Sequence, residues 1–166
     1  IATKKISMVK IRHINDLLAE APLFEGMKPE QLESLAGCGK LAHFREGEFL
    51  LKEGEEADHF FLIRNGEVSV ESHLPGGVLT VAKAGEERVV GYSWLFPPYR
   101  NQFDARATTD VDVIVLDGKC LRDKTHQDHE LGYQFMKRFA ALMLQRMQSA
   151  RRQLLDVYGK PSEANP

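Results

Sequence analysis

Glycines divide the stretch between residues 40 and 117 into short apolar runs, and this spacing restricts the fold more than any other feature. Runs of this length are too short for helices, and many short strands with closely spaced turns are typical of a β-sandwich or barrel. The runs are Phe49–Leu51, Phe60–Ile63, Val68–Val70, Val78–Val81, Val89–Val90 and Val111–Leu116, and the glycines are Gly47, Gly54, Gly66, Gly76, Gly77, Gly85 and Gly91. We therefore predict a β-roll over residues 40–118.

Two patterns in this stretch predict tight turns. In FFLIRNGEVSVES, Asn65 and Gly66 both accept positive φ angles, so a type I′ hairpin turn fits between two alternating strands. In HLPGGV, residues 73–78, a proline and two glycines indicate a hairpin tip rather than a phosphate-binding loop. We expect one hairpin on each side of the run Val68–Val70.

Helical patterns occupy residues 12–39. Pro22 ends the first helix, and Pro29 suits the first turn of the second. The inward faces are Ile14, Leu17, Leu18 and Ala21 in the first helix, and Leu32 and Leu35 in the second. We predict two short helices before the β-roll.

Helical patterns return over residues 119–158, and the segment from His129 to Tyr158 contains no proline. A heptad seam is formed by Met136, Ala140, Met143, Met147, Ala150, Leu154 and Val157. This seam has two interpretations, packing on the chain's own roll or pairing with a second helix; we favour a homodimer. The basic residues Lys137, Arg138, Arg146, Arg151 and Arg152 are assigned to a solvated helix face. We expect a disordered tail at residues 159–166.

Composition excludes several classes of protein. The 166 residues fit one domain, and a net charge of −2 does not match a nucleic-acid binder. No apolar run is long enough to span a membrane, and the chain does not open on a signal peptide. We predict a cytoplasmic protein in which Cys38 and Cys120 are free thiols.

Common catalytic patterns are also missing. No GxSxG, P-loop, HExxH or GxGxxG sequence occurs, so we expect no enzyme. His126 and His129 are three residues apart, but no third ligand accompanies them, and we assign them to a solvated face rather than a metal site.

The stretch GEFLLKEGEEADHFFLIRNGEVSVES resembles the front half of a cyclic-nucleotide-binding domain, with Gly47, Gly54, Asp58 and Gly66 at matching places. The resemblance covers residues 20–158. It implies a mainly β fold, a double-stranded β-helix or jelly roll, flanked by helices and followed by a long dimerisation helix. It further implies a regulatory, non-enzymatic role.

Residues 91–110, GYSWLFPPYRNQFDARATTD, resemble the phosphate-binding cassette of that family, and we call them the cassette segment. In the family, a glutamate binds the ribose 2′-hydroxyl and an arginine nine residues later pairs with the cyclic phosphate. Here Tyr92 and Asn101 stand at those positions, and Arg100 precedes the second. The resemblance implies that cAMP or cGMP does not bind in the usual mode. The ligand-binding residues we expect are Gly91, Tyr92, Ser93, Trp94, Arg100, Asn101 and Gln102.

Aromatic residues in the cassette segment leave two interpretations open. Trp94, Phe96, Tyr99 and Phe103 could stack another nucleotide, such as NAD(P)(H), or they could fill the space that a ligand would occupy.

Two functions follow from the resemblance. The first is a nucleotide-sensing module with an altered pocket; a wet pocket near Tyr92 and Asn101 would favour it. The second is an accessory subunit of a larger enzyme complex, such as a soluble NAD(P)-linked hydrogenase; exposed aromatic surface around Trp94, Tyr99 and Phe103 would favour it. The transcription factors of the family carry a helix-turn-helix after the long helix, so we expect DNA binding only if the chain is a fragment.

Overall fold

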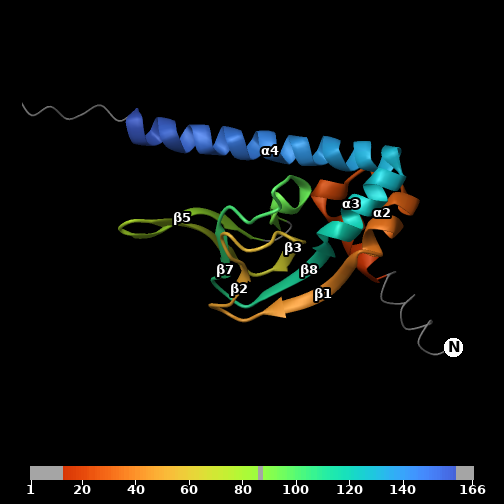
Figure 1. Cartoon of the computed structure of the whole chain (residues 1–166), viewed down its shortest axis with the longest axis horizontal. Coiled ribbons are helices and arrows are strands. Elements are labelled where there is room, and N and C mark those ends of the chain that lie inside the picture. Colours follow the sequence, from red (N-terminus) through yellow and green to blue (C-terminus); the bar gives the residue numbers. More distant parts are fainter. Residues whose placement is uncertain (1–12, 86–87, 160–166) are drawn as a thin grey trace, which may run out of the picture.

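The computed structural model describes residues 13–85 and 88–159, and its centre is a roll of two antiparallel sheets (Figure 1). One sheet has the strand order β1-β8-β3-β6 and the other β2-β7-β4-β5. The strands are β1 Gly39–Phe44, β2 Phe49–Leu51, β3 His59–Asn65, β4 Val68–Leu74, β5 Gly77–Ala84, β6 Val89–Val90, β7 Asp104–Ala107 and β8 Val111–Asp117. The predicted mainly β fold with flanking helices is confirmed.

Helices lie before and after the roll. Residues 13–20 are helical, and η1 Pro22–Phe24 and α2 Pro29–Ala36 follow. After the roll, α3 Gly118–Gln127 leads into α4 His129–Tyr158, the predicted long C-terminal helix. In Figure 1, α4 runs along one side of the roll, and α2 and α3 lie together at one end. Within the described residues, no helix is both long enough and apolar enough to cross a membrane.

Two hydrophobic cores hold these layers together. The first lies inside the roll and is built from strand residues such as Phe61, Val68, Ala105 and Val113. The second lies between the roll and the helices. Its fully buried large side chains include Ile14, Leu18, Phe24, Leu35, Phe60, Trp94, Leu121 and Phe139. The second core therefore joins the N-terminal helices, β3, the cassette segment, α3 and α4 into one body.

The turn at Asn65 and Gly66 does not form the predicted hairpin. β3 pairs with β6 and β8, whereas β4 pairs with β5 and β7, so the turn carries the chain from one sheet to the other. Gly66 has φ +90°, but Asn65 is not among the residues with positive φ, which excludes a type I′ turn. The second expected hairpin is present, because Leu74 pairs with Gly77 at the β4–β5 tip.

The two cysteines are not free thiols. Cys38, at the entry to β1, and Cys120, in the first turn of α3, form a disulfide with Cα atoms 5.6 Å apart. The bond closes a loop across a sequence separation of 82 residues, and no spacing pattern in the sequence pairs cysteines so distant. The prediction of free thiols is wrong on this structure.

Most of the predicted disordered tail, residues 160–166, lies outside the described residues.

Gly66, in the turn between the sheets, can be compared with Gly47, because both have a positive φ angle but only Gly66 has close neighbours. A Cβ at Gly66 would lie 2.2 Å from the carbonyl oxygen of Asp110, whereas a Cβ at Gly47, whose φ is +89°, would meet nothing within 4 Å. We expect Gly47→Ala to lower the free energy of unfolding by about 1 kcal/mol through strain alone. We expect Gly66→Ala to lower it by about 3 kcal/mol, because the chain must also move. Urea unfolding of both variants measures the difference; equal losses would contradict the predicted clash.

Candidate functional site

The cassette segment begins at Gly91, passes through the short helix η2 Ser93–Leu95 and through β7, and ends at Asp110. Gly91 is buried with φ +83°, and a Cβ there would lie 2.9 Å from the carbonyl oxygen of His59. The middle of the segment pairs with residues 54–57: Gly54 N–H donates to the Asn101 carbonyl at 2.8 Å, and Asn101 N–H donates to the Glu55 carbonyl at 2.9 Å. Backbone hydrogen bonds therefore hold the middle of the segment against residues 54–57.

Trp94 anchors the segment in the second core. Its side chain is fully buried, and its ring lies 6.0 Å from Phe60 of β3, 5.8 Å from Phe135 and 6.4 Å from Phe139 of α4. The Arg122 guanidinium of α3 donates to the Trp94 carbonyl oxygen. The predicted ligand residue Trp94 is thus placed as a packing residue between the cassette and both C-terminal helices.

Tyr92, at the position of the family's glutamate, lies half-buried where the two cores meet. Its ring is 5.6 Å from Phe103 and 6.4 Å from Phe139. The Arg146 guanidinium of α4 lies 5.2 Å from the centre of the Tyr92 ring and also donates to the Val89 carbonyl oxygen. A cation therefore faces the tyrosine that replaces the ribose-binding carboxylate.

The remaining predicted ligand residues divide between interior and surface. Asn101 is buried and Ser93 half-buried, whereas Arg100 and Gln102 are exposed. The Gln102 side-chain amide donates to the Arg100 carbonyl at 3.0 Å, which fixes a surface turn. The structure brings Tyr92 and Trp94 together with α4 and leaves Arg100 facing solvent.

Two arginines that sequence reasoning did not place at the site lie against it. Arg122 was not singled out, and Arg146 was assigned to a solvated face. Besides binding the Trp94 carbonyl, Arg122 lies over the Tyr99 ring at 4.4 Å. Arg138 of α4 is also engaged with the N-terminal region, through the Glu25 carbonyl at 2.7 Å. The pattern of charges on a helix did not reveal these contacts, because they depend on which face meets the roll.

The aromatic residues of the cassette segment do not form the exposed surface that would favour an accessory subunit. Trp94 and Phe103 are buried and Tyr99 is half-buried, so the exposed aromatic surface expected of an accessory subunit is not formed by them. Phe96 is the exposed aromatic of the segment, at 52%. Packing of Tyr92, Trp94 and Phe103 against neighbouring rings agrees better with the alternative in which aromatics fill the ligand space.

Arg106, near the end of the segment, belongs to the outer face of the second sheet. Its guanidinium pairs with the buried Glu71 carboxylate at 2.7 Å, from the neighbouring strand β4. Hydrogen bonding to Arg106 lowers the pKa of Glu71, and a hydrogen bond from Ser69 acts in the same direction. This ion pair joins the β7 part of the cassette segment to the neighbouring strand β4.

Residues 13–85 and 88–159 contain no cluster of three His, Cys, Asp or Glu side chains placed to hold a metal ion.

Comparison with known proteins identifies the class. Residues 41–128 match the family model described as "Cyclic nucleotide-binding domain", which is more than half of the chain. The chain therefore belongs to the cyclic nucleotide-binding domain family, whose members are typically non-catalytic sensing domains. Family membership confirms the resemblance inferred from the glycine pattern.

Individual relatives place the chain within that family. It is 25% identical over 127 residues to the CRP-like cAMP-activated global transcriptional regulator of Mycobacterium tuberculosis, covering 75% of this chain and 56% of the regulator. The chain thus spans little more than half the length of that relative.

Solved structures agree with the fold. A candidate cyclic nucleotide-binding protein from Geobacter metallireducens superposes with a TM-score of 0.73 at 28% identity, covering 80% of this chain and 97% of that one. The regulatory subunit of a cAMP-independent protein kinase A from Trypanosoma cruzi, bound to guanosine, has a TM-score of 0.63 at 23% identity, covering 69% and 41%. The second likeness shows the fold alone.

The ion pair of Glu71 predicts a pH dependence of stability. Because folding lowers the pKa of Glu71, its stabilising contribution is complete above the ordinary glutamate pKa of 4.5 and is lost as the pH falls through the folded-state value. We expect the melting temperature of Glu71→Gln to fall less steeply than that of the wild type between about pH 6 and about pH 3. Asp123→Asn, at an exposed partner of Lys119, serves as the control and should keep the wild-type slope. Parallel curves for the wild type and Glu71→Gln would contradict the assignment.

Proposed function

We propose that this chain is a non-enzymatic regulatory module that senses a nucleotide or nucleoside in an altered cassette and transmits the signal through α4 as a dimer. The observation that carries the proposal is the direct attachment of the cassette segment to the C-terminal helices. Trp94 packs on Phe135 and Phe139, and Arg146 of α4 lies over Tyr92. A ligand that displaces Tyr92 would therefore act on α4 without an intermediate element.

The ligand would be recognised more through its base than through its phosphate. With asparagine in place of the cassette arginine, the usual charged partner of a cyclic phosphate is absent, and such a loss costs several kcal/mol. Aromatic rings and two guanidinium groups remain, and both kinds of group stack on bases. The guanosine-bound kinase subunit from Trypanosoma cruzi is a reason to test a nucleoside without phosphate.

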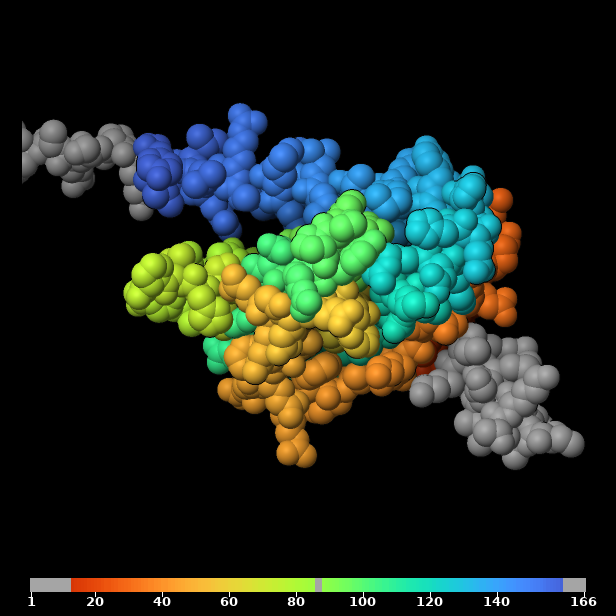
Figure 2. All heavy atoms as spheres, viewed as in Figure 1, coloured from red at the N-terminus to blue at the C-terminus, as the bar shows by residue number. Residues whose placement is uncertain are grey.

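The dimer would form through the part of α4 that does not contact the roll. Leu131, Phe135 and Phe139 are buried against the core, and Met143 packs partly against it. Beyond these residues the seam is open, with Met147 63%, Leu154 58% and Val157 71% exposed. In Figure 2, open space separates the C-terminal half of α4 from the tip of the β4–β5 hairpin. A second α4 is the partner that the heptad spacing predicts.

The alternative, an accessory subunit of a redox enzyme complex that binds NAD(P)(H), stays a prediction. Its supporting surface would be the apolar seam of α4 rather than the cassette aromatics, which are mostly buried. The two functions differ in what the isolated chain does: a sensor binds its ligand alone, whereas a subunit whose nucleotide site lies at the junction binds only within the complex.

Calorimetric titration tests the sensor. We expect micromolar binding of one compound among cAMP, cGMP, NADH, NADPH and guanosine. Arg146→Ala should weaken that binding by about tenfold, because the substitution removes the cation that faces Tyr92. Arg100→Ala tests whether the exposed arginine shifts toward the ligand. Arg151→Ala, an exposed site further along α4, is the control and should bind as the wild type does. Absence of binding by all five compounds would refute the sensor.

Sedimentation equilibrium tests the dimer. Two glutamates placed in the seam, Met147→Glu with Leu154→Glu, should convert a dimer at micromolar concentration into a monomer, because both charges would be buried in the helix pair. Gln145→Glu with Arg152→Glu places the same residues on the opposite, exposed face of α4 and should leave the dimer intact. A monomeric wild type, or dissociation by both double variants, would argue against the seam.

A further inference from the structure

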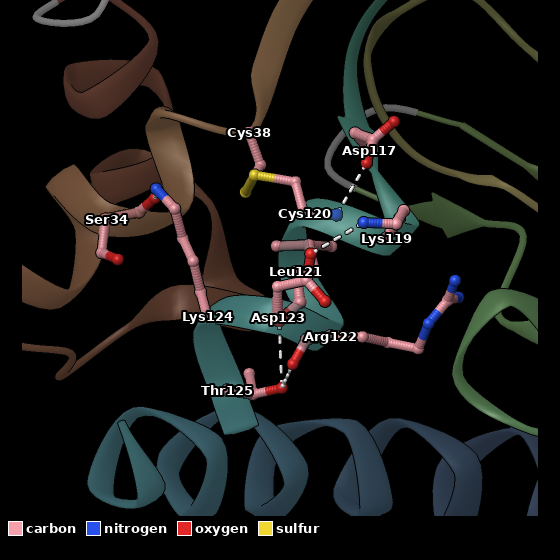
Figure 3. Close-up of a disulfide and its surroundings, with 10 residues drawn as sticks. All are labelled: Ser34, Cys38, Asp117, Lys119, Cys120, Leu121, Arg122, Asp123, Lys124 and Thr125. Atoms are coloured by element: carbon pink, nitrogen blue, oxygen red, sulfur yellow. Dashed lines mark hydrogen bonds and ion pairs between the residues drawn. A yellow bond between two sulfur atoms is a disulfide. The ribbon is translucent and has the colours of Figure 1, made fainter. Parts of the chain in front are cut away.

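Helix α3 stands between the disulfide and the cassette segment. Cys120 lies in its first turn, bonded to Cys38, and its N–H is capped by the Asp117 carboxylate at 2.7 Å. Two residues later, Arg122 holds the Trp94 carbonyl and covers the Tyr99 ring. Figure 3 shows that the Arg122 side chain leaves α3 on the side away from Lys124 and points toward the cassette ribbon. A shift of the first turn of α3 would therefore reach the cassette directly.

The two cysteine residues differ in exposure. Cys38 belongs to the second core and is only 8% exposed, whereas Cys120 is partly exposed. Cys120 also lines a shallow surface hollow, together with Asp117, Lys119, Asp123, Lys124 and Gln127. An external thiol can approach the disulfide from this hollow, and access decides which sulfur of a disulfide is attacked.

Few other bonds tie α3 to the entry of β1. The Lys124 ammonium donates to the Ser34 carbonyl oxygen at the end of α2, and the Asp117 N–H donates to the Cys38 carbonyl at 2.9 Å. Partial burial lowers the pKa of Lys124, so this contact carries a desolvation cost. The disulfide is the covalent link of this junction. Its loss would leave α3 held by these bonds, by the Gly118 N–H that donates to the Asp58 carbonyl at 2.8 Å, by Arg122 and by Leu121 in the core.

We propose that Cys120 is a thiol-exchange site and that its disulfide with Cys38 controls the order of the cassette segment through Arg122. The proposal concerns the order of the cassette segment and holds for any ligand, so it does not rest on the proposed sensor.

The exchange needs a thiol reductant, either glutathione or the dithiol of an oxidoreductase. Its thiolate attacks Sγ of Cys120, the bond between Cys120 and Cys38 breaks, and Cys38 leaves as a thiolate that takes a proton from water. A second thiolate then attacks the reductant's sulfur in the mixed disulfide. The products are the Cys120 thiolate and the oxidised reductant, with two electrons transferred in total.

Thiol trapping and hydrogen exchange test the proposal on the whole chain. Alkylation without reductant should label neither cysteine, and alkylation after reduction should label both. With limiting glutathione, peptide mass spectrometry should find the mixed disulfide on Cys120. After full reduction, amides of residues 93–100 and 118–124 should exchange several-fold faster, while β3 and β8 stay protected.

Two substitutions separate transmission through Arg122 from a general loss of stability. Arg122→Gln should give fast exchange at residues 93–100 in the oxidised protein, with little further change on reduction. Arg151→Gln, at an exposed arginine of α4 outside this hollow, is the matched control and should respond as the wild type does. Two free thiols in the unreduced chain, glutathione on Cys38, or unchanged cassette exchange after reduction would each overturn the proposal. These readouts need no ligand, so failure here is distinct from failure of the sensor.

Discussion

The packing of Trp94 against three phenylalanines is the contact on which the arrangement of the domain depends. Phe60 comes from the roll, Phe135 and Phe139 from α4, and Trp94 from the cassette segment. Each such ring pair contributes about 1 kcal/mol beyond the area it buries. The cluster also bears a cost, because the Trp94 indole N–H is buried without a partner among the described residues. The cassette of this protein is consequently built into its core rather than laid over an empty pocket.

Because the cassette is packed into the core, a ligand can bind only if its own contacts offset the ring contacts that it separates. Entry beside Tyr92 would separate its ring from Phe103 and Phe139, at about 1 kcal/mol for each contact. Stacking of a base on an aromatic ring returns about 1–3 kcal/mol. By these figures the free energies of the two contacts are close to balance for a base. Asn101 stands where the family's arginine would pair with a phosphate, and this is why we propose recognition of a planar base rather than of a phosphate.

The sequence was informative wherever local patterns decide the outcome. Glycine spacing and apolar runs predicted the roll, the PGG sequence predicted the β4–β5 tip, and the uninterrupted helical pattern predicted α4. It failed where distant segments meet. The turn at Asn65 and Gly66 was expected to join paired strands, but a turn signal does not say which sheet the next strand enters.

Local sequence patterns do not show which distant segments meet, and for this reason several residues near the candidate site were not predicted. Cys38 and Cys120 are brought together only when α3 packs beside the entry to β1. Arg122 and Arg146 reach the cassette because of the rotation of their helices against the roll, which charge patterns do not define. Trp94 and Arg100 were both expected to bind the ligand, but the structure places the Trp94 side chain in the core and Arg100 in solvent.

Arg146 marks the point where α4 leaves the roll, and this position has a mechanical consequence. Before it, Leu131, Phe135 and Phe139 are buried in the second core and Met143 packs against it, whereas the twelve residues after it, 147–158, are exposed. At 1.5 Å per residue this free arm is about 18 Å long, so a tilt of about 10° at Arg146 would move its end by about 3 Å. Because Arg146 binds both the Val89 carbonyl and the Tyr92 ring, the pivot of the arm lies at the candidate ligand position itself. In the proposed dimer, a small displacement of Tyr92 would thus be enlarged along the seam, where the helix pair would be sensitive to shifts of a few ångströms.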